Sequence, residues 1–348
     1  MTRTTINPER RNAIKEVVLS VLSRIPDIAL PVNIKEICKS YPNIRLIPFS
    51  VHMKRRNLSY EEVKAYCGTS DSCADYYADF DKYIIYYNDV DKTSIVNSNR
   101  YRWNIAHELG HILLEHHKKY NKTRIFRSSL SAQEYNYLEE EADYFAQLIL
   151  VPHVVLYAFK IKNASQIKRQ CQISGPAATR RFYAYKEWTN NLTRNDQYDK
   201  DLFRYYYNFI YKKECRTCGA HLIQEKGKFC PICGKKTIQW GDGKMIYPKF
   251  ETHETGKLKL CPICQNEDTL IEGDFCQICG NGLVNYCIND GCSNAEILPA
   301  NARYCPVCGY QSSFFQNNIL QKWNYNKDNN NDAFMSIPDG IDEELPFN

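Results

Sequence analysis

Twelve of the sixteen cysteines fall between residues 215 and 308, and their spacing constrains the fold of this region more than any other feature. Two sets of four have the pattern C-x2-C-x11-C-x2-C, and a third has C-x4-C-x12-C-x2-C. Close pairs of this kind are typical of metal ligands rather than of disulfides, and four thiolates predict a closed tetrahedral zinc site. The predicted ligands are Cys215, Cys218, Cys230 and Cys233; Cys261, Cys264, Cys276 and Cys279; and Cys287, Cys292, Cys305 and Cys308.

Each set lies in a segment too short to fold by burying apolar side chains, so metal binding has to supply the folding free energy. The segments resemble zinc ribbons, and we expect three of them, at residues 212–236, 258–282 and 284–312, with one structural zinc each. The other four cysteines are scattered, and we expect them to be reduced, partly buried thiols. These are Cys38, Cys67, Cys73 and Cys171.

The charge of the chain is distributed unevenly, which bears on what the ribbons bind. Residues 1–209 carry a net charge of +8, residues 210–312 carry +1, and residues 313–348 carry −4. Four thiolates on one Zn²⁺ add −2 per site, which brings the ribbon region to about −5 when it is loaded. A nucleic-acid-binding surface is normally basic. We therefore expect the ribbons to bind protein or to self-associate, and do not favour nucleic acid.

The stretch NIAHELGHILLEHH, residues 104–117, indicates a second kind of metal site. We expect one helix over residues 101–118. His107 and His111 are four residues apart, so they project from the same face and can bind one zinc. Glu108 is placed to reach a water on the metal as a general base. His116 and His117 lie too close along the same helix to complete the ligand set, and we expect them to be exposed.

A catalytic zinc needs a third protein ligand and one open position. The following helix, predicted over residues 131–151 with a capping box at Ser131 and Glu134, places Glu139 and Asp143 on one face. We predict Glu139 as the third ligand and Asp143 as an acceptor that orients a ligand histidine. Glu140 and Glu141 should point into solvent.

The region before these helices mixes helix and strand signals, which predicts an α+β domain. Asn7 and Pro8 begin a helix, a capping box opens another at Ser59, and the β-branched and aromatic run at 82–88 predicts a strand. Because peptide substrates add to a strand edge, we expect this strand to be the edge on which substrate docks. The predicted substrate-binding residues are Tyr83, Ile84, Ile85, Tyr86, Tyr87 and Asn88.

The stretch RYRWNIAHELGHILLEHH, followed by YLEEEADYFAQLILVP, resembles the ImmA/IrrE metallopeptidases. The residues that match the family pattern are Asn88, Ile105 to His111, Glu139, Ala142, Asp143, Phe145, Ala146 and Pro152. The resemblance covers roughly residues 10–190 and implies a zincin-like domain with zinc on His107, His111 and Glu139 and with Glu108 as base. It also implies a substrate, a helix-turn-helix repressor of a phage or mobile element. The cysteine-rich C-terminal region departs from the family pattern.

The expected organisation is a zincin-like metallopeptidase domain at residues 1–210, three ribbons within 212–312, and a disordered acidic tail at 313–348. Residues 164–188 fit either a helix-turn-helix or a helical pair packed on the peptidase core. No apolar run reaches the length of a membrane span, so we expect a cytoplasmic protein with one catalytic and three structural zinc ions. The alternative function is a non-enzymatic regulator, DNA-binding or antitoxin-like, that uses zinc only structurally.

Overall fold

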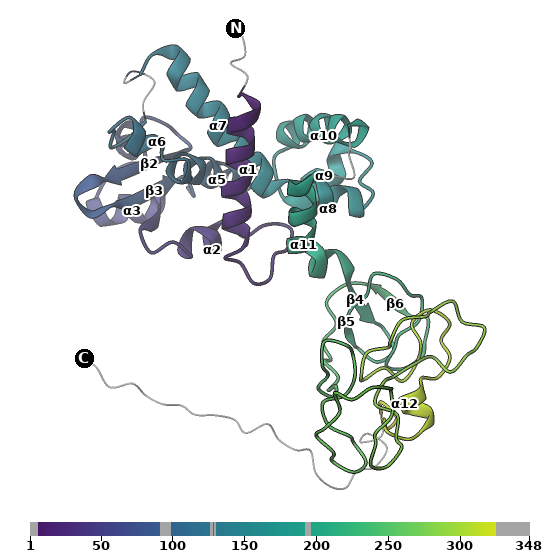
Figure 1. Ribbon diagram of the computed structural model, residues 1–348. Helices are drawn as coiled ribbons and strands as arrows, with labels where there is room; N and C mark the ends of the chain where they lie inside the picture. The colour runs from purple at the N-terminus through teal and green to yellow at the C-terminus, as the bar shows by residue number, and fades with distance from the viewer. Residues whose placement is uncertain (1–5, 91–98, 126–127, 129, 192–195, 325–348) are drawn as a thin grey trace. The chain divides into compact units, whose positions relative to one another are not determined.

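The computed structural model describes residues 6–90, 99–125, 128, 130–191 and 196–324 (Figure 1). It divides into two compact units, Met1–Ile210 and Tyr211–Asn348. In the described part of the chain, no helix is both long and apolar enough to cross a bilayer. The first unit contains α1 (Pro8–Leu22), α2 (Ile34–Lys39), β1 (Ile44–Pro48), α3 (Phe49–Arg56), α4 (Tyr60–Cys67), β2 (Ser72–Tyr77), η1 (Ala78–Phe80), β3 (Lys82–Tyr87), α5 (Arg100–Leu113), α6 (His116–Lys119), α7 (Ala132–Leu150), α8 (His153–Ala158), α9 (Ala164–Cys171), α10 (Gly175–Asn190) and α11 (Gln197–Tyr211).

Local sequence signals account for where several of these elements begin. The Asn7 side chain accepts a hydrogen bond from the Arg10 amide at the start of α1, with Pro8 as first helical residue. Complete capping boxes open α4 at Ser59 and α7 at Ser131, as predicted. The predicted strand is β3. Its expected place at the sheet edge is wrong, because the strand order is β1-β3-β2, with β1 parallel and β2 antiparallel to β3.

Helix α5 packs between the sheet and α7, and this layer positions the candidate site. The sheet-facing and α7-facing side of α5 is apolar, with Ile105, Ala106 and Leu109 fully buried. Gly110 allows the close crossing of the two helices, because a Cβ there would lie 3.1 Å from the Ala142 Cα and 3.2 Å from its carbonyl oxygen. Helix α1 packs on the other side of α7. The α5–α7 crossing therefore sets how near side chains of the two helices can come.

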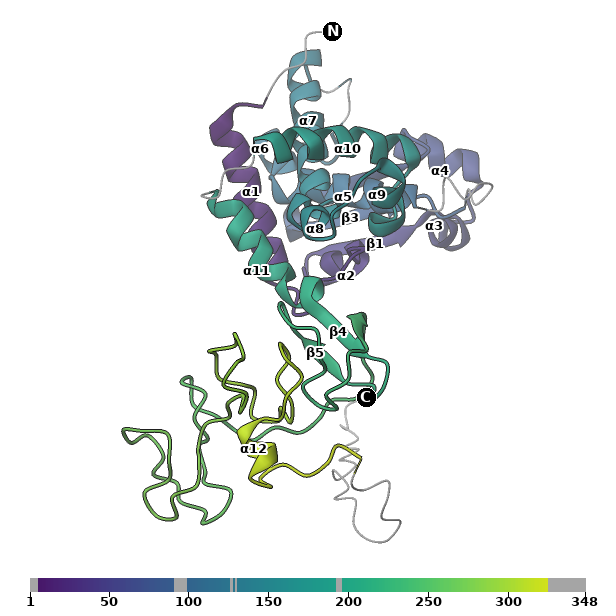
Figure 2. The ribbon, with the colours of Figure 1, turned by 90° about the vertical axis from the view of Figure 1, so that its right-hand side faces the viewer.

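Helix α5 ends earlier than predicted, and this changes the surroundings of its histidines. The helix stops at Leu113, Glu115 adopts a left-handed conformation (φ 61°), and α6 begins at His116 in a new direction. Helices α8, α9 and α10 form a group on one side of the unit (Figure 2). Residues 164–188 are thus two helices packed together within the first unit.

The second unit is built around the cysteine sets, with little regular secondary structure. It contains β4 (Lys212–Cys215), β5 (His221–Ile223), β6 (Ile238–Trp240) and α12 (Ser313–Gln316), and its sheet has the order β5-β4-β6. The prediction of a disordered tail from residue 313 is wrong for residues 313–324. Phe314 and Leu320 are buried against Leu258 and Leu283 and so belong to the core of the second ribbon. Residues 325–348, on which the rest of that prediction falls, lie outside the described residues.

Candidate metal centre

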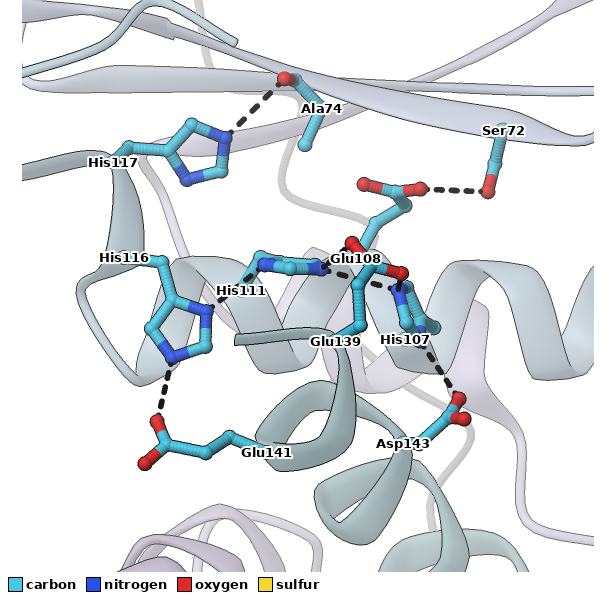
Figure 3. A network of polar contacts seen from close by, with 10 residues as sticks. All are labelled: Ser72, Ala74, His107, Glu108, His111, His116, His117, Glu139, Glu141 and Asp143. Atoms are coloured by element: carbon cyan, nitrogen blue, oxygen red, sulfur yellow. Dashed lines mark hydrogen bonds and ion pairs between the residues drawn. The ribbon is translucent and has the colours of Figure 1, made fainter. Parts of the chain in front are cut away.

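Three predicted ligands converge at the crossing of α5 and α7 (Figure 3). The Nε2 atoms of His107 and His111 are 3.1 Å apart. The Glu139 carboxylate oxygens lie 3.3 Å from His107 Nε2 and 3.4 Å from His111 Nε2. A tetrahedral zinc with bonds of about 2.05 Å holds its ligand atoms roughly 3.3 Å apart. The separation of the two Nε2 atoms is therefore close to one edge of a zinc tetrahedron, and each histidine lies at that distance from one of the two Glu139 oxygens.

The other ring nitrogens of both histidines are occupied, which directs their Nε2 lone pairs toward the centre. His107 Nδ1 lies 3.0 Å from an Asp143 carboxylate oxygen, as predicted for an orienting acceptor, and His111 Nδ1 lies 2.9 Å from His116 Nδ1. With a proton on each of these Nδ1 atoms, both Nε2 atoms are acceptors. Two imidazole lone pairs and a carboxylate then face one another without a proton between them, an arrangement that a cation stabilises.

The predicted exposure of His116 and His117 is wrong, since both are buried. The chain changes direction at Glu115, which has a left-handed backbone conformation. His116 and His117 therefore lie off the axis of α5, toward α7 and the sheet. His116 contacts His111 and Glu141, and His117 Nε2 lies 3.3 Å from the Ala74 carbonyl oxygen. The single continuous helix predicted from the sequence would not bring either ring against His111 or the sheet.

Glu141 is likewise buried rather than solvated, and it lies at the end of a series of contacts that starts at His111, one of the predicted ligands. His116 Nε2 lies 2.9 Å from Glu141 Oε2, and the Arg10 guanidinium donates to both Glu141 oxygens at 2.6 and 2.7 Å. Burial opposes ionisation of Glu141, but His116 and Arg10 outweigh it and lower its pKa to about 2. Arg10, on α1, thus fixes a carboxylate that in turn fixes the ring behind His111.

The electrostatics of the triad differ from ligand to ligand. Burial lowers the pKa of both histidines, but in His107 the contacts with Asp143 and Glu139 outweigh it and raise the pKa to about 10. In His111 burial dominates, and the pKa falls to about 3. Burial also opposes ionisation of Glu139, yet the two histidines hold its pKa well below the usual range. The carboxylates thus make the triad favourable for positive charge.

Glu108 points away from the triad toward β2. The Ser72 hydroxyl donates to Glu108 Oε1 at 2.9 Å, which leaves Oε2 for another partner. Burial raises the pKa of Glu108 above its ordinary value, although His107 and the Ser72 hydroxyl oppose this. A carboxylate with a raised pKa is a better proton acceptor than an exposed one. Ser72 was not singled out from the sequence, because no motif connects it to Glu108.

A cavity of about 800 Å³ opens over these side chains. His107, Glu108, His111 and Glu139 all line it, so the triad has an accessible side. Its other walls come from β2 and the preceding loop, from α5, from the segment 124–128, and from the start of α10. Lining residues that were not predicted from the sequence include Asp71, Ser72, Ala74, Trp103, Asn104, Arg124, Ser174, Pro176 and Arg180.

The strand at the cavity is β2, and the predicted docking strand β3 is covered on both sides. Residues 83–87 of β3 pair with β1 and with β2, and none of them lines the cavity. On β2, the Tyr76 amide donates to the Thr123 carbonyl at 2.7 Å, so Tyr76 directs its backbone groups away from β3. The direction of the backbone N–H and C=O groups alternates from residue to residue along a strand. The backbone groups of Ser72 and Ala74 therefore also point away from β3. The edge of β2 that faces the cavity is therefore Ser72–Ala74, and the Ala74 carbonyl oxygen is already 3.3 Å from His117 Nε2.

The cysteine sets form three compact clusters in the second unit. In each set the four sulfur atoms lie within 4.8 Å of one another, and neighbouring Sγ atoms are separated by 3.5 to 3.8 Å. Zn–S bonds of about 2.3 Å give an edge of roughly 3.8 Å. Four thiolates fill a tetrahedron and leave no position for a substrate. These sites therefore fit structural zinc.

The helix–sheet layer and the His–His–Glu triad, with a glutamate beside it on the cavity, define a zincin-like metallopeptidase domain, followed by three clusters that fit zinc ribbons. Comparison with known families agrees with this class. The sequence model of the peptidase family described as the IrrE N-terminal-like domain matches residues 66–181, which agrees with the predicted resemblance to the ImmA/IrrE metallopeptidases. No curated protein matched the sequence.

Proposed function

We propose that the protein is a zinc metallo-endopeptidase. The observation that carries this proposal is the placement of three converging ligands and a separate buried carboxylate on one cavity. Zinc held by His107, His111 and Glu139 would supply a Lewis acid that lowers the pKa of water and polarises a peptide carbonyl. Glu108, steadied by Ser72, takes the proton of the attacking water and delivers a proton to the leaving amine.

The substrate is proposed to bind as an extended strand along β2. Ser72 and Ala74 direct backbone groups toward the cavity, and such groups recognise the main chain of any extended peptide. Main-chain pairing does not select a sequence, so selectivity has to come from the other cavity walls. Arg180 gives these walls a cationic group, whereas the Arg124 guanidinium is already bound by the Asp75 carboxylate. On the family resemblance, we propose a helix-turn-helix repressor as the protein that is cut.

The ribbon unit is proposed to bind protein rather than nucleic acid. Its three thiolate clusters make the region acidic when zinc is bound, which opposes contact with phosphates. A second module on the same chain can also raise the local concentration of a substrate at the cavity. The expected location of this activity is the cytoplasm.

The test of the proposed activity is Glu108→Gln. This substitution preserves size and the Ser72 contact but removes the proton acceptor, so we expect cleavage of a co-expressed helix-turn-helix repressor encoded beside the gene to fall at least about 100-fold. Zinc content should not change, because Glu108 is not a ligand. Glu115→Gln, on an exposed residue at the end of the same motif, is the matched control and should cleave normally.

Normal cleavage by Glu108→Gln would contradict the proposed mechanism. The alternative function, a non-enzymatic regulator, makes a different prediction. In that case the wild-type protein leaves every repressor intact, and the fragment of residues 1–210 retains a specific DNA. Arg180 lines the cavity over the triad, which favours the peptidase.

A further inference from the structure

A seven-residue motif occurs once in each ribbon: a polar residue, an aromatic residue, Cys, Pro or Gln, Ile or Val, Cys and Gly. We name these segments knuckle 1 (228–234), knuckle 2 (274–280) and knuckle 3 (303–309). Each contributes the last two ligands of its cysteine set. The structure gives knuckles 1 and 3 a partner and leaves knuckle 2 without one among the described residues.

Knuckles 1 and 3 bind each other through reciprocal backbone hydrogen bonds. The amides of Lys228 and Phe229 donate to the Pro306 carbonyl at 2.7 and 3.0 Å. In return, the amides of Arg303 and Tyr304 donate to the Pro231 carbonyl at 2.8 and 3.0 Å. Equivalent residues of the two knuckles thus exchange equivalent bonds.

The aromatic rings make the same exchange. The Tyr304 ring lies over Gly234, where a Cβ would come within 2.9 Å of it, and the Phe229 ring lies over Gly309, where a Cβ would come within 2.7 Å. Both glycines have positive φ, 72° and 76°, so they serve the turn and the contact together. Because each side supplies the same donors, acceptor, ring and glycine, the pairing is related by an approximate two-fold axis and is self-complementary.

Knuckle 2 presents these same groups to solvent. Phe275 is 66% exposed and Ile278 is 72% exposed, whereas the equivalent Ile232 of knuckle 1 is only 1% exposed. A Cβ on Gly280, which has φ 71°, would meet no atom within 4 Å. The residue types are nearly the same in the three knuckles. The difference in exposure therefore comes from the pairing of knuckles 1 and 3.

The backbone of knuckle 2 also has the conformation that this pairing requires. Phe275 lies opposite Gly282 in an antiparallel bridge, as Tyr304 lies opposite Gln311 in knuckle 3. The flanking amides of Cys276 and Cys305 turn inward, to Asn281 and Tyr310, so the amides of Phe275 and Tyr304 turn outward. Among the described residues, no hydrogen bond joins the Asp274 amide, the Phe275 amide or the Gln277 carbonyl, the three groups that the pairing uses.

We propose that knuckle 2 binds knuckle 2 of a second copy of the chain, in the arrangement seen between knuckles 1 and 3. A second copy is the natural occupant because the pairing is self-complementary and because the other two knuckles are already engaged. Asp274 replaces the basic residue of the other knuckles, but its carboxylate is held by the Tyr286 hydroxyl at 2.6 Å. Leu260, Ile263 and Leu270 are further apolar side chains that are exposed in the same ribbon. The small area predicts a weak, concentration-dependent dimer.

Sedimentation equilibrium of the zinc-loaded, full-length protein over a wide concentration range tests this. The wild type should pass from monomer to dimer, and Phe275→Asp should weaken the dimer at least about tenfold. Gln277→Pro copies the residue of the other two knuckles and keeps the carbonyl acceptor, so it should still dimerise. Ile246→Asp, at a residue that is 83% exposed in the same unit but outside the knuckles, is the matched control.

Zinc content, measured on every variant, reports whether the ribbons remain folded, because both replaced side chains of knuckle 2 project into solvent. A wild-type protein that is monomeric at all concentrations overturns the proposal. So does a dimer that Phe275→Asp and Ile246→Asp weaken equally or leave intact, since its interface then lies elsewhere. A dimer lost in Phe275→Asp, with zinc content unchanged, and kept in Gln277→Pro and Ile246→Asp supports it.

Discussion

The two kinds of candidate zinc site in this chain differ in what comes first, the fold or the metal. The His–His–Glu triad lies where two long helices cross, and its third ligand follows the second by 28 residues. Apolar side chains and the Gly110 contact already hold those helices together. Each cysteine cluster draws its ligands from about 20 residues with little apolar core, so there the metal has to organise the chain.

The two kinds of site also differ in whether their geometry leaves a position for a reacting group. The triad supplies three ligands on a cavity and leaves room for a fourth, whereas each thiolate set closes its tetrahedron. The triad further depends on carboxylates and histidines behind its ligands, while the clusters depend on backbone turns around the sulfurs. Loss of metal should therefore have different results in the two units.

The largest expected effect is on the second unit when zinc is removed. We expect four zinc ions per chain in the purified protein, with a structural site worth about 10–16 kcal/mol of folding free energy. Graded chelation should remove the triad zinc first and leave the first unit folded, and then unfold the ribbons. Elemental analysis with limited proteolysis measures both steps. One zinc per chain, or ribbons that resist proteolysis without metal, would contradict this contrast.

A smaller effect should distinguish the two carboxylates behind the histidines. Glu141→Ala removes the buried partner of Arg10 and His116, so we expect a loss of about 3–5 kcal/mol in the free energy of unfolding. Asp143→Ala removes a carboxylate whose side chain is 50% exposed, and should cost much less stability. Both should weaken zinc binding about 10- to 100-fold, because each carboxylate orients one ligand ring.

Urea unfolding and competition with a zinc chelator give the two quantities. Equal stability of Glu141→Ala and Asp143→Ala would show that the side-chain contacts linking Arg10, Glu141, His116 and His111 do not stabilise the fold. Unchanged zinc affinity in both variants would show instead that the rings keep their positions without these carboxylates.

The smallest expected effect concerns pH and lies away from both metal sites. Burial among Tyr185 and Trp188, aided by the Arg181 cation, lowers the pKa of His153 to about 4. Between that value and the unfolded pKa of about 6.5, His153 takes up a proton only in the unfolded chain. Protonation of His153 therefore lowers the free energy of unfolding as the pH falls. His153→Phe removes this pH-dependent contribution to stability.

The difference in unfolding free energy between wild type and His153→Phe should therefore shift against the wild type on acidification, by up to about 3 kcal/mol. Urea unfolding followed by tryptophan fluorescence at neutral and acidic pH measures it. A difference that does not change with pH would mean that His153 titrates alike in the folded and unfolded states.

Features that depend on neighbouring residues could be read from the sequence. Capping boxes placed the starts of α4 and α7, the β-branched run placed β3, and cysteine spacing grouped the thiolates. Helical periodicity also brought His107 and His111 to one face. In each case the ligands or capping groups lie within one or two turns, or within one short segment, so spacing determines their geometry.

Features that depend on tertiary packing were missed. A strong strand pattern at residues 82–87 does not say whether a second strand covers its outer edge, and here β2 does. The reversal at Glu115 uses a residue with no particular preference for the left-handed region, so the burial of His116 could not be foreseen. Phe314 fills the core of a ribbon that ends, by its cysteines, before that residue.

The contact between Arg10 and Glu141 also determines how much of the chain makes up the module that carries the His–His–Glu triad. Arg10 lies on α1, more than fifty residues before the segment that matches the family. A fragment cut at the family boundaries would keep His107, His111, Glu139 and Glu108, yet it would leave Glu141 buried without its cation. The unit that inheritance or engineering can transfer intact is therefore larger than the unit that sequence comparison outlines, and it begins at the first helix.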